Sequence, residues 1–90
     1  TLWTDVLQYL GEFETAIEIL LEASNVLPDE YEIEYRLAGL YFLMDDVTKG
    51  NLHLINGMKL EPKHLTLFQE LFPVVWERTE VQNTILKFKK

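Results

Sequence analysis

Apolar residues recur along most of the chain at the three- and four-residue spacing of a helix that is buried on one side. This pattern is clearest between Gly11 and Pro28, where it predicts a helix over residues 13–27. A broader apolar face covers residues 31–44, and a further helical stretch runs from about Val47 to Leu60. No segment alternates with the two-residue period of a strand. The pattern therefore predicts an all-α chain.

The sequence also repeats itself with a period of 34 residues, the distance between Pro28 and Pro62. The same shift aligns large apolar residues with one another, small residues with small ones, and turn-forming residues with turn-forming ones. The aligned positions are Trp3, Leu37 and Leu71; Leu7, Tyr41 and Val75; Gly11, Asp45 and Thr79; Ala16, Gly50 and Thr84; and Leu20, Leu54 and Phe88. Such a period is typical of stacked helix pairs. We therefore predict six helices, antiparallel within three pairs.

Turn-forming residues mark the boundaries between these helices. Gly11 can supply the positive φ that a tight connection needs before the second helix. Asp45 and Asp46 interrupt the apolar pattern between the third and fourth helices, because short acidic side chains tolerate turns and cap helices. We expect both positions to be loops.

Two capping boxes and one helix break are also predicted. In a capping box, the side chain of the first residue accepts from the backbone N–H three residues later, and the side chain of that later residue accepts from the backbone N–H of the first. The pairs with this spacing are Asp29 with Glu32 and Thr79 with Gln82. Pro73 lies inside the predicted fifth helix, over residues 64–77, and cannot donate to the carbonyl of residue 69. We expect a kink or a break there.

Small residues recur seven positions apart in the second helix of two pairs. They are Ala16 and Ala23 in the first pair, and Gly50 and Gly57 in the second. A glycine inside a helix costs roughly 1 kcal/mol relative to alanine, so two in one helix indicate a compensating close contact between helix axes.

At this point the residues resemble a known family, the tetratricopeptide repeats. The run Gly11-Glu12-Phe13-Glu14-Thr15-Ala16, followed by Leu20, Ala23 and Pro28, is similar to the second half of such a repeat, and the stretch containing Leu37-Ala38, Leu40-Tyr41-Phe42, Gly50, Leu54, Gly57 and Pro62 resembles a full one. The resemblance implies one domain over residues 1–90: a partial repeat over 1–30, a full repeat over 31–64, and a truncated, divergent repeat over 65–90. It also implies a short right-handed superhelix of stacked helix pairs.

Charge is distributed unevenly. Residues 1–35 contain nine Asp and Glu and no Lys or Arg, whereas residues 36–90 contain eight Lys and Arg and six Asp and Glu. The net charge is −7. Because an acidic surface repels phosphate, we expect no nucleic-acid partner and no anionic membrane partner. No apolar run approaches the roughly 18–20 residues that cross a bilayer.

The sequence offers little for catalysis. His53 and His64 have no second ligand at helical spacing, and Asp45-Asp46 lacks the further oxygen ligands of a calcium loop. The glycines are scattered singly, and Ser24 has no nearby base. We therefore expect a protein that is not an enzyme and uses no cofactor or metal.

The resemblance implies a binding role instead. In tetratricopeptide proteins the first helix of each pair lines a concave groove that takes a peptide or a helix of a partner. Carried over by position, the groove residues are Asp5, Gln8, Tyr9, Glu32, Tyr35, Arg36, Gly39, Phe42, Leu43 and Gln69. Only one of them is basic, so we expect a neutral or basic segment rather than an acid-tailed one. The alternative is a structural solenoid segment with no ligand of its own, which burial of Tyr35 and Phe42 would favour.

The first helix suggests a second kind of contact. It carries more apolar surface than one neighbouring helix can cover. The apolar residues are Leu2, Trp3, Val6, Leu7 and Leu10. We therefore expect this helix to associate with another copy of the chain or with upstream repeats. The sequence begins with Thr1 and contains no cysteine. We expect a piece of a longer protein, and the compartment stays open, with the cytoplasm as the default.

Overall fold

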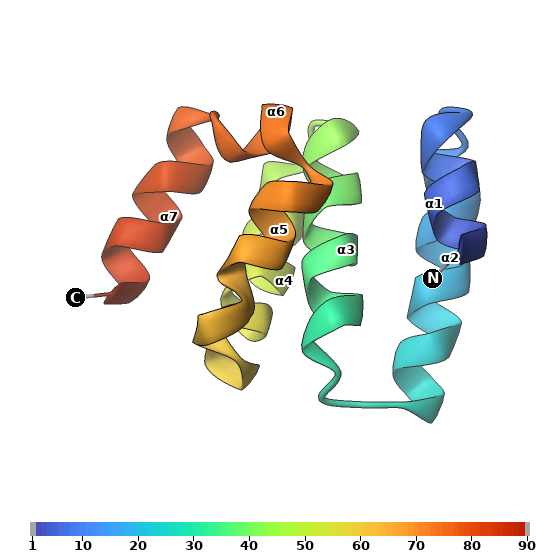
Figure 1. Cartoon of the computed structure of the whole chain (residues 1–90), viewed down its shortest axis with the longest axis horizontal. Coiled ribbons are helices and arrows are strands. Elements are labelled where there is room, and N and C mark those ends of the chain that lie inside the picture. Colours follow the sequence, from blue (N-terminus) through green and yellow to red (C-terminus); the bar gives the residue numbers. More distant parts are fainter. Residues whose placement is uncertain (1, 90) are drawn as a thin grey trace.

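The computed structural model describes the backbone of residues 2–89 and the side chains of residues 5–89. Within this range the chain is all-helical and contains no strand, as predicted. The elements are α1 (Leu2–Tyr9), α2 (Phe13–Val26), α3 (Tyr31–Leu43), α4 (Val47–Leu60), a short 3₁₀ helix η1 (Pro62–His64), α5 (Leu65–Leu71), α6 (Pro73–Trp76) and α7 (Thr79–Lys89) (Figure 1).

The count of six helices is wrong because the predicted fifth helix is divided. It ends as α5 at Leu71, and α6 begins at Pro73, where a residue without an N–H is tolerated in the first turn. Phe72 lies between them and donates its N–H to the carbonyl of Phe68. The expected break at Pro73 is thus confirmed.

Most predicted boundaries are also confirmed. Gly11 has a φ of 78° between α1 and α2, and Asp45 has a φ of 61° between α3 and α4. The carboxylate of Asp46 accepts from the backbone N–H of Lys49 at 3.1 Å and so caps α4. The α4 range is the one predicted from the sequence.

Both predicted capping boxes are wrong. The residue that precedes α3 is Glu30, whose side chain makes no capping bond, while Asp29 has a φ of 65° and turns the chain. Asp29 therefore takes the left-handed turn conformation that short acidic residues tolerate. Thr79 is already the first residue of α7, and the Gln82 amide donates to the carbonyl of Trp76 at 2.7 Å.

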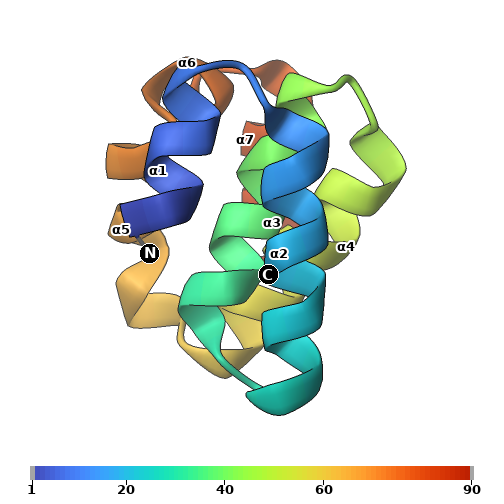
Figure 2. The ribbon, with the colours of Figure 1, turned by 90° about the vertical axis from the view of Figure 1, so that its right-hand side faces the viewer.

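The centre of the molecule is α3, which packs against α2, α4, α5 and α6. Six consecutive residues, from Tyr35 to Leu40, are buried. A helix that is enclosed on all sides does not show a one-sided apolar stripe. In Figure 2, α1, α5 and α6 lie on one side of the molecule and α4 lies on the other, with α3 between them.

Close contacts between rings and glycines hold these helices together. A Cβ placed on Gly50 would lie 2.8 Å from the Phe42 ring, and one on Gly57 would lie 2.7 Å from the Tyr35 ring. The predicted close packing at these two glycines is therefore confirmed, and its partners are aromatic side chains of α3.

The third pair departs from a regular repeat. α7 packs mainly against α4 and makes fewer contacts with α6. Figure 1 shows α7 at one end of the long axis, tilted away from α5, and the α1–α2 pair at the other end. The result is a compact helical fold of 34 × 25 × 21 Å.

Candidate functional site

The ten residues predicted to line a groove do not form one surface. Tyr35, Gly39 and Phe42 are buried, and Arg36 is only 8% exposed. Gln8, Glu32 and Leu43 are half-buried, and only Asp5, Tyr9 and Gln69 are exposed. The predicted groove is therefore wrong in its central part, where the side chains that would meet a partner belong to the core.

Gly39 shows why the centre of that groove is closed. A Cβ placed on Gly39 would lie 2.3 Å from the ring of Phe72, which comes from the segment between α5 and α6. The ring of Phe72 therefore occupies the space above the Gly39 backbone. Gly39 was assigned to the binding surface by its position in the tetratricopeptide resemblance, and position alone does not show that the ring of Phe72 fills the space above it.

Tyr35 has a structural hydrogen bond. Its hydroxyl donates to the backbone carbonyl of Glu61 at 3.0 Å. Burial, with a smaller contribution from the negative charge of Glu61, raises the pKa of Tyr35 to about 12. The phenol thus stays protonated at neutral pH and links α3 to the end of α4.

Arg36 is a paired cation between two helices. Its Nε donates to Oε2 of Glu32 at 3.2 Å, and an NH1 hydrogen bond reaches Oδ1 of Asp5 on α1. The Arg36 side chain is only 10% exposed. The two carboxylates therefore occupy most of the guanidinium surface that a ligand could reach. Arg36 therefore ties α1 to α3, and an acidic ligand would have to compete with two carboxylates that it already contacts.

A second polar cluster lies between α3 and α4. Nδ1 of His53 lies 2.6 Å from Oε2 of Glu34, and both side chains are less than a fifth exposed. The His53 ring stacks on Tyr41 with centroids 5.5 Å apart, and the ammonium of Lys49 lies 5.6 Å from the centroid of Tyr41. Sequence reasoning missed this contact, since the two partners are 19 residues apart. The cluster joins two helices of one pair and suits a structural role.

A concave site lies between the second half of α2 and the first half of α3. It is a groove of about 180 Å³, which we call the α2–α3 groove. Its described lining is mainly apolar, with two acids and one base at its edge: Ile19, Leu20, Ala23, Leu27, Glu30, Glu32, Ile33 and Arg36. Figures 1 and 2 both show that α2 continues past the N-terminal end of α1. Within the described residues, α1 does not extend over this part of α2.

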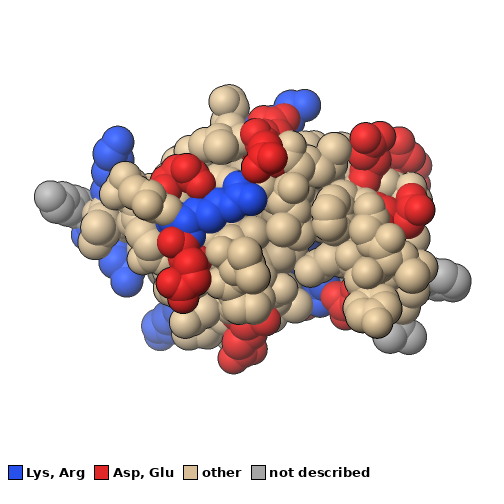
Figure 3. Space-filling view, turned by 90° about the horizontal axis from the view of Figure 1, so that it is seen from above, with Lys and Arg blue, Asp and Glu red and all other residues tan. Residues whose placement is uncertain are grey.

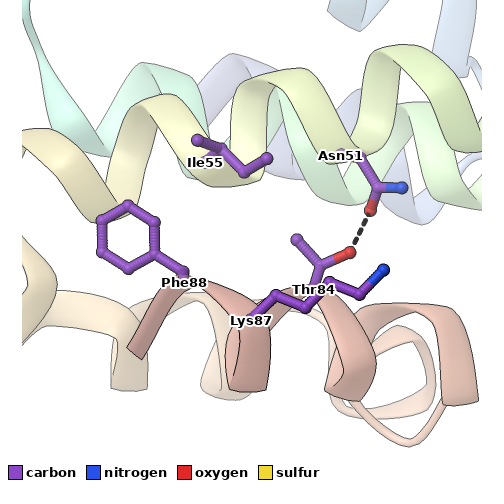
Figure 4. A pocket seen from close by; sticks show the side chains of 5 residues that line it. All are labelled: Asn51, Ile55, Thr84, Lys87 and Phe88. Atoms are coloured by element: carbon purple, nitrogen blue, oxygen red, sulfur yellow. Dashed lines mark hydrogen bonds between the residues drawn. The ribbon is translucent and has the colours of Figure 1, made fainter. Parts of the chain in front are cut away.

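Another hollow, of about 390 Å³, separates α4 from α7. Figure 4 shows Ile55 and Phe88 on its apolar side, and the hydroxyl of Thr84 pointing toward Asn51, to whose Oδ1 it donates at 2.8 Å. Lys87 lines the same hollow. Asn51 and Thr84 are thus bonded to each other, and the hollow opens widely to solvent. We regard it as the consequence of the tilted α7.

Neither a cluster of metal ligands nor a bilayer-spanning helix occurs among the described residues. No group of three or more His, Cys, Asp or Glu side chains lies close enough to hold a metal ion among these residues. His64, which the sequence already disfavoured as a metal ligand, stacks on Tyr31 with ring centroids 4.7 Å apart. None of the described helices has the length and apolar character needed to span a bilayer.

Comparisons with protein-family models, with curated proteins and with solved structures found no match for this chain. The site must therefore be interpreted from its own geometry.

Proposed function

We propose that this chain is a protein-interaction module that binds a short neutral or basic segment of a partner in the α2–α3 groove. The observation that carries the proposal is the composition of this groove. Ile19, Ala23, Leu27 and Ile33 provide an apolar floor, and Glu30 is an exposed acid at its edge. A floor of this kind favours a large apolar side chain, because burial gains about 25 cal/mol per Å² of apolar area.

Charge favours a basic neighbour for that apolar side chain. α2 carries exposed Glu14, Glu18 and Glu22, and no Lys or Arg occurs before Arg36. The base at the edge of the groove, Arg36, already contacts Asp5 and Glu32. A Lys or Arg in the partner would therefore meet a negative field, and an Asp or Glu would be repelled. The proposed ligand has one or two large apolar residues next to a basic one.

The tetratricopeptide resemblance remains a second support for a binding role, with a different surface. The groove that the family uses is lined by the first helix of each pair. The α2–α3 groove instead lies between α2, the second helix of one pair, and α3, the first helix of the next pair. We therefore carry over the class of function, protein binding without catalysis, and not the residues.

A structural segment without a ligand is the second candidate. Tyr35 and Phe42 are both fully buried, which favours this alternative. In this case the helices would serve to space or join other parts of a longer protein. The two candidates differ in one measurable property, which is whether the isolated chain binds a peptide at all.

The test is a calorimetric titration with matched peptides of identical length that carry Leu next to Lys, Gln or Asp. We expect binding of the Lys peptide, weaker binding of the Gln peptide and none of the Asp peptide. Ala23→Trp fills the groove and should abolish binding, whereas Asn25→Trp adds the same ring at an exposed position of the same helix and should not.

Charge is tested separately with Glu30→Lys, which should weaken binding of the Lys peptide. Glu80→Lys makes the same change in net charge at an exposed position of α7 and is the control. If none of the peptides binds, the structural alternative replaces the proposal. If the Asp peptide binds most tightly, the charge argument is wrong.

A further inference from the structure

The two ends of the molecule differ in charge. The α1–α2 end has exposed acids at Glu18 and Glu22 on α2, whereas α7 has exposed bases at Lys87 and Lys89. In Figure 3, one cluster of acidic side chains lies at the end that carries α1 and α2, further acids are spread over the middle of this face, and basic side chains lie mostly toward the α7 end. The ends are separated along the 34 Å axis of the molecule, so α7 cannot fold back onto the α1–α2 end of its own chain.

Both ends also expose large apolar side chains. Val6 on α1 and Leu10, directly after it, are 42% and 64% exposed, and Val26 at the end of α2 is 78% exposed. On α7, Leu86 is 59% exposed and stands next to Lys87. Single exposed apolar residues are ordinary, but Val6 and Leu10 are four positions apart and so lie one helical turn from each other, which makes this part of the surface suited to association.

We propose that the α1–α2 end of one copy binds α7 of a second copy, so that copies of this chain associate head to tail. Leu86 would pack against Val6 and Leu10, and Lys87 and Lys89 would face Glu18 and Glu22. This contact uses the outer surface of the first pair and does not involve the α2–α3 groove.

Charge complementarity favours contact of the α1–α2 end with α7 of a second copy over contact between two α1–α2 ends. Two copies meeting through their α1–α2 ends would bring exposed acids of like charge together, and like-charge juxtaposition opposes association. The α7 end supplies the opposite charge. Because the two contacting surfaces are different, the contact is heterologous and leaves one free surface at each end of a dimer. Association should therefore continue beyond dimers as concentration rises.

The strength of the contact should depend on salt. The charged groups on both sides are exposed, and the Debye length falls from about 10 Å at 0.1 M salt to about 3 Å at 1 M. We expect the average mass measured by sedimentation or light scattering to increase with protein concentration at low salt, without a plateau at the dimer. It should decrease toward that of the monomer as salt is added.

Charge reversal provides the decisive test. Lys87→Glu with Lys89→Glu should weaken association about tenfold, because two attractive surface pairs become repulsive. Glu18→Lys with Glu22→Lys should have the same effect. An equimolar mixture of these two variants should associate again, since each α7 then faces an α2 of opposite charge. The matched control is Lys59→Glu with Lys63→Glu, which changes the net charge equally at exposed positions of α4 and η1.

Two results would overturn the proposal. One is a strict monomer at all concentrations at low salt. The other is association that persists unchanged in the α7 variant, which would place the contact elsewhere. Circular dichroism of each variant confirms that the helices remain folded. Ala23→Trp, which blocks the α2–α3 groove, should leave association unchanged, so the two proposals fail independently.

Discussion

The ring of Tyr35 lies directly over the backbone of Gly57, so that a Cβ on Gly57 would come within 2.7 Å of Cε1 of the ring. The hydroxyl of the same tyrosine donates to the carbonyl of Glu61, four residues further along the chain. One side chain of α3 thus sets both the distance between α3 and α4 and the position of the end of α4.

Glycine substitutions test this close packing. Gly57→Ala and Gly50→Ala should each destabilise the fold by about 1–3 kcal/mol, because the added methyl group overlaps the ring of Tyr35 or Phe42. Alanine has a higher helix propensity than glycine, so this contribution to the free energy of unfolding opposes the loss from the packing overlap. Urea denaturation measures the net effect. Unchanged or increased stability in both variants would show that these contacts relax easily.

The phenol of Tyr35 predicts a loss of stability at high pH. Its pKa rises from the ordinary 10.0 to about 12 in the folded state, mainly through burial. Between pH 10 and 12 the unfolded chain therefore loses the Tyr35 proton while the folded chain keeps it. The contribution of this group is fully present below pH 10 and decreases above it.

The variant Tyr35→Phe isolates this effect from the other tyrosines. At neutral pH it should be less stable by about 1 kcal/mol, the usual net value of one hydrogen bond. From pH 10 to 12 its stability should fall less steeply than that of the parent. Parallel curves over this range would contradict the assignment.

The left-handed residue before α4 predicts a stabilising substitution. Asp45 has a φ of 61°, and its exposed carboxylate lies 3.3 Å from NH1 of Arg78. Exposed ion pairs contribute about 0–1 kcal/mol, whereas the left-handed conformation costs a residue with a Cβ roughly 1–2 kcal/mol. We expect Asp45→Gly to match or exceed the parent in thermal stability, and Asp45→Val to be less stable than both.

The contact between Glu34 and His53 should be measurable as a coupling. Glu34→Gln and His53→Gln each remove one partner of a hydrogen bond between side chains that are less than a fifth exposed. A double-mutant cycle at neutral pH should give an interaction energy of about 1 kcal/mol. Additive effects would mean that the contact with Glu34 contributes nothing to stability and that His53 stabilises the fold through its stacking on Tyr41.

The sequence predicted the helices better than it predicted the surface. The helices and most of their ends could be predicted because the signals are local. The apolar period and the effects of Gly11, Asp46 and Pro73 each involve only neighbouring residues of the chain. The capping boxes failed because spacing alone does not say whether a residue such as Asp29 caps a helix or turns the chain before it.

The candidate site could not be predicted in the same way. Gly39 and Phe42 are buried by contacts with Phe72 and Gly50, residues that are 33 and 8 positions away. Likewise the α2–α3 groove combines Ile19 and Leu27 with Ile33, which comes from the next helix. Such consequences follow from packing between helices, which a local pattern does not contain.

The most direct test of the proposed binding site is a nuclear magnetic resonance titration of the labelled chain with the Lys-containing peptide. We predict that the backbone amide shifts that change are confined to the second half of α2 and the first half of α3, around Ile19, Ala23, Leu27 and Ile33. Changes centred on α5, α6 or α7, or no change at saturating peptide, would contradict the account.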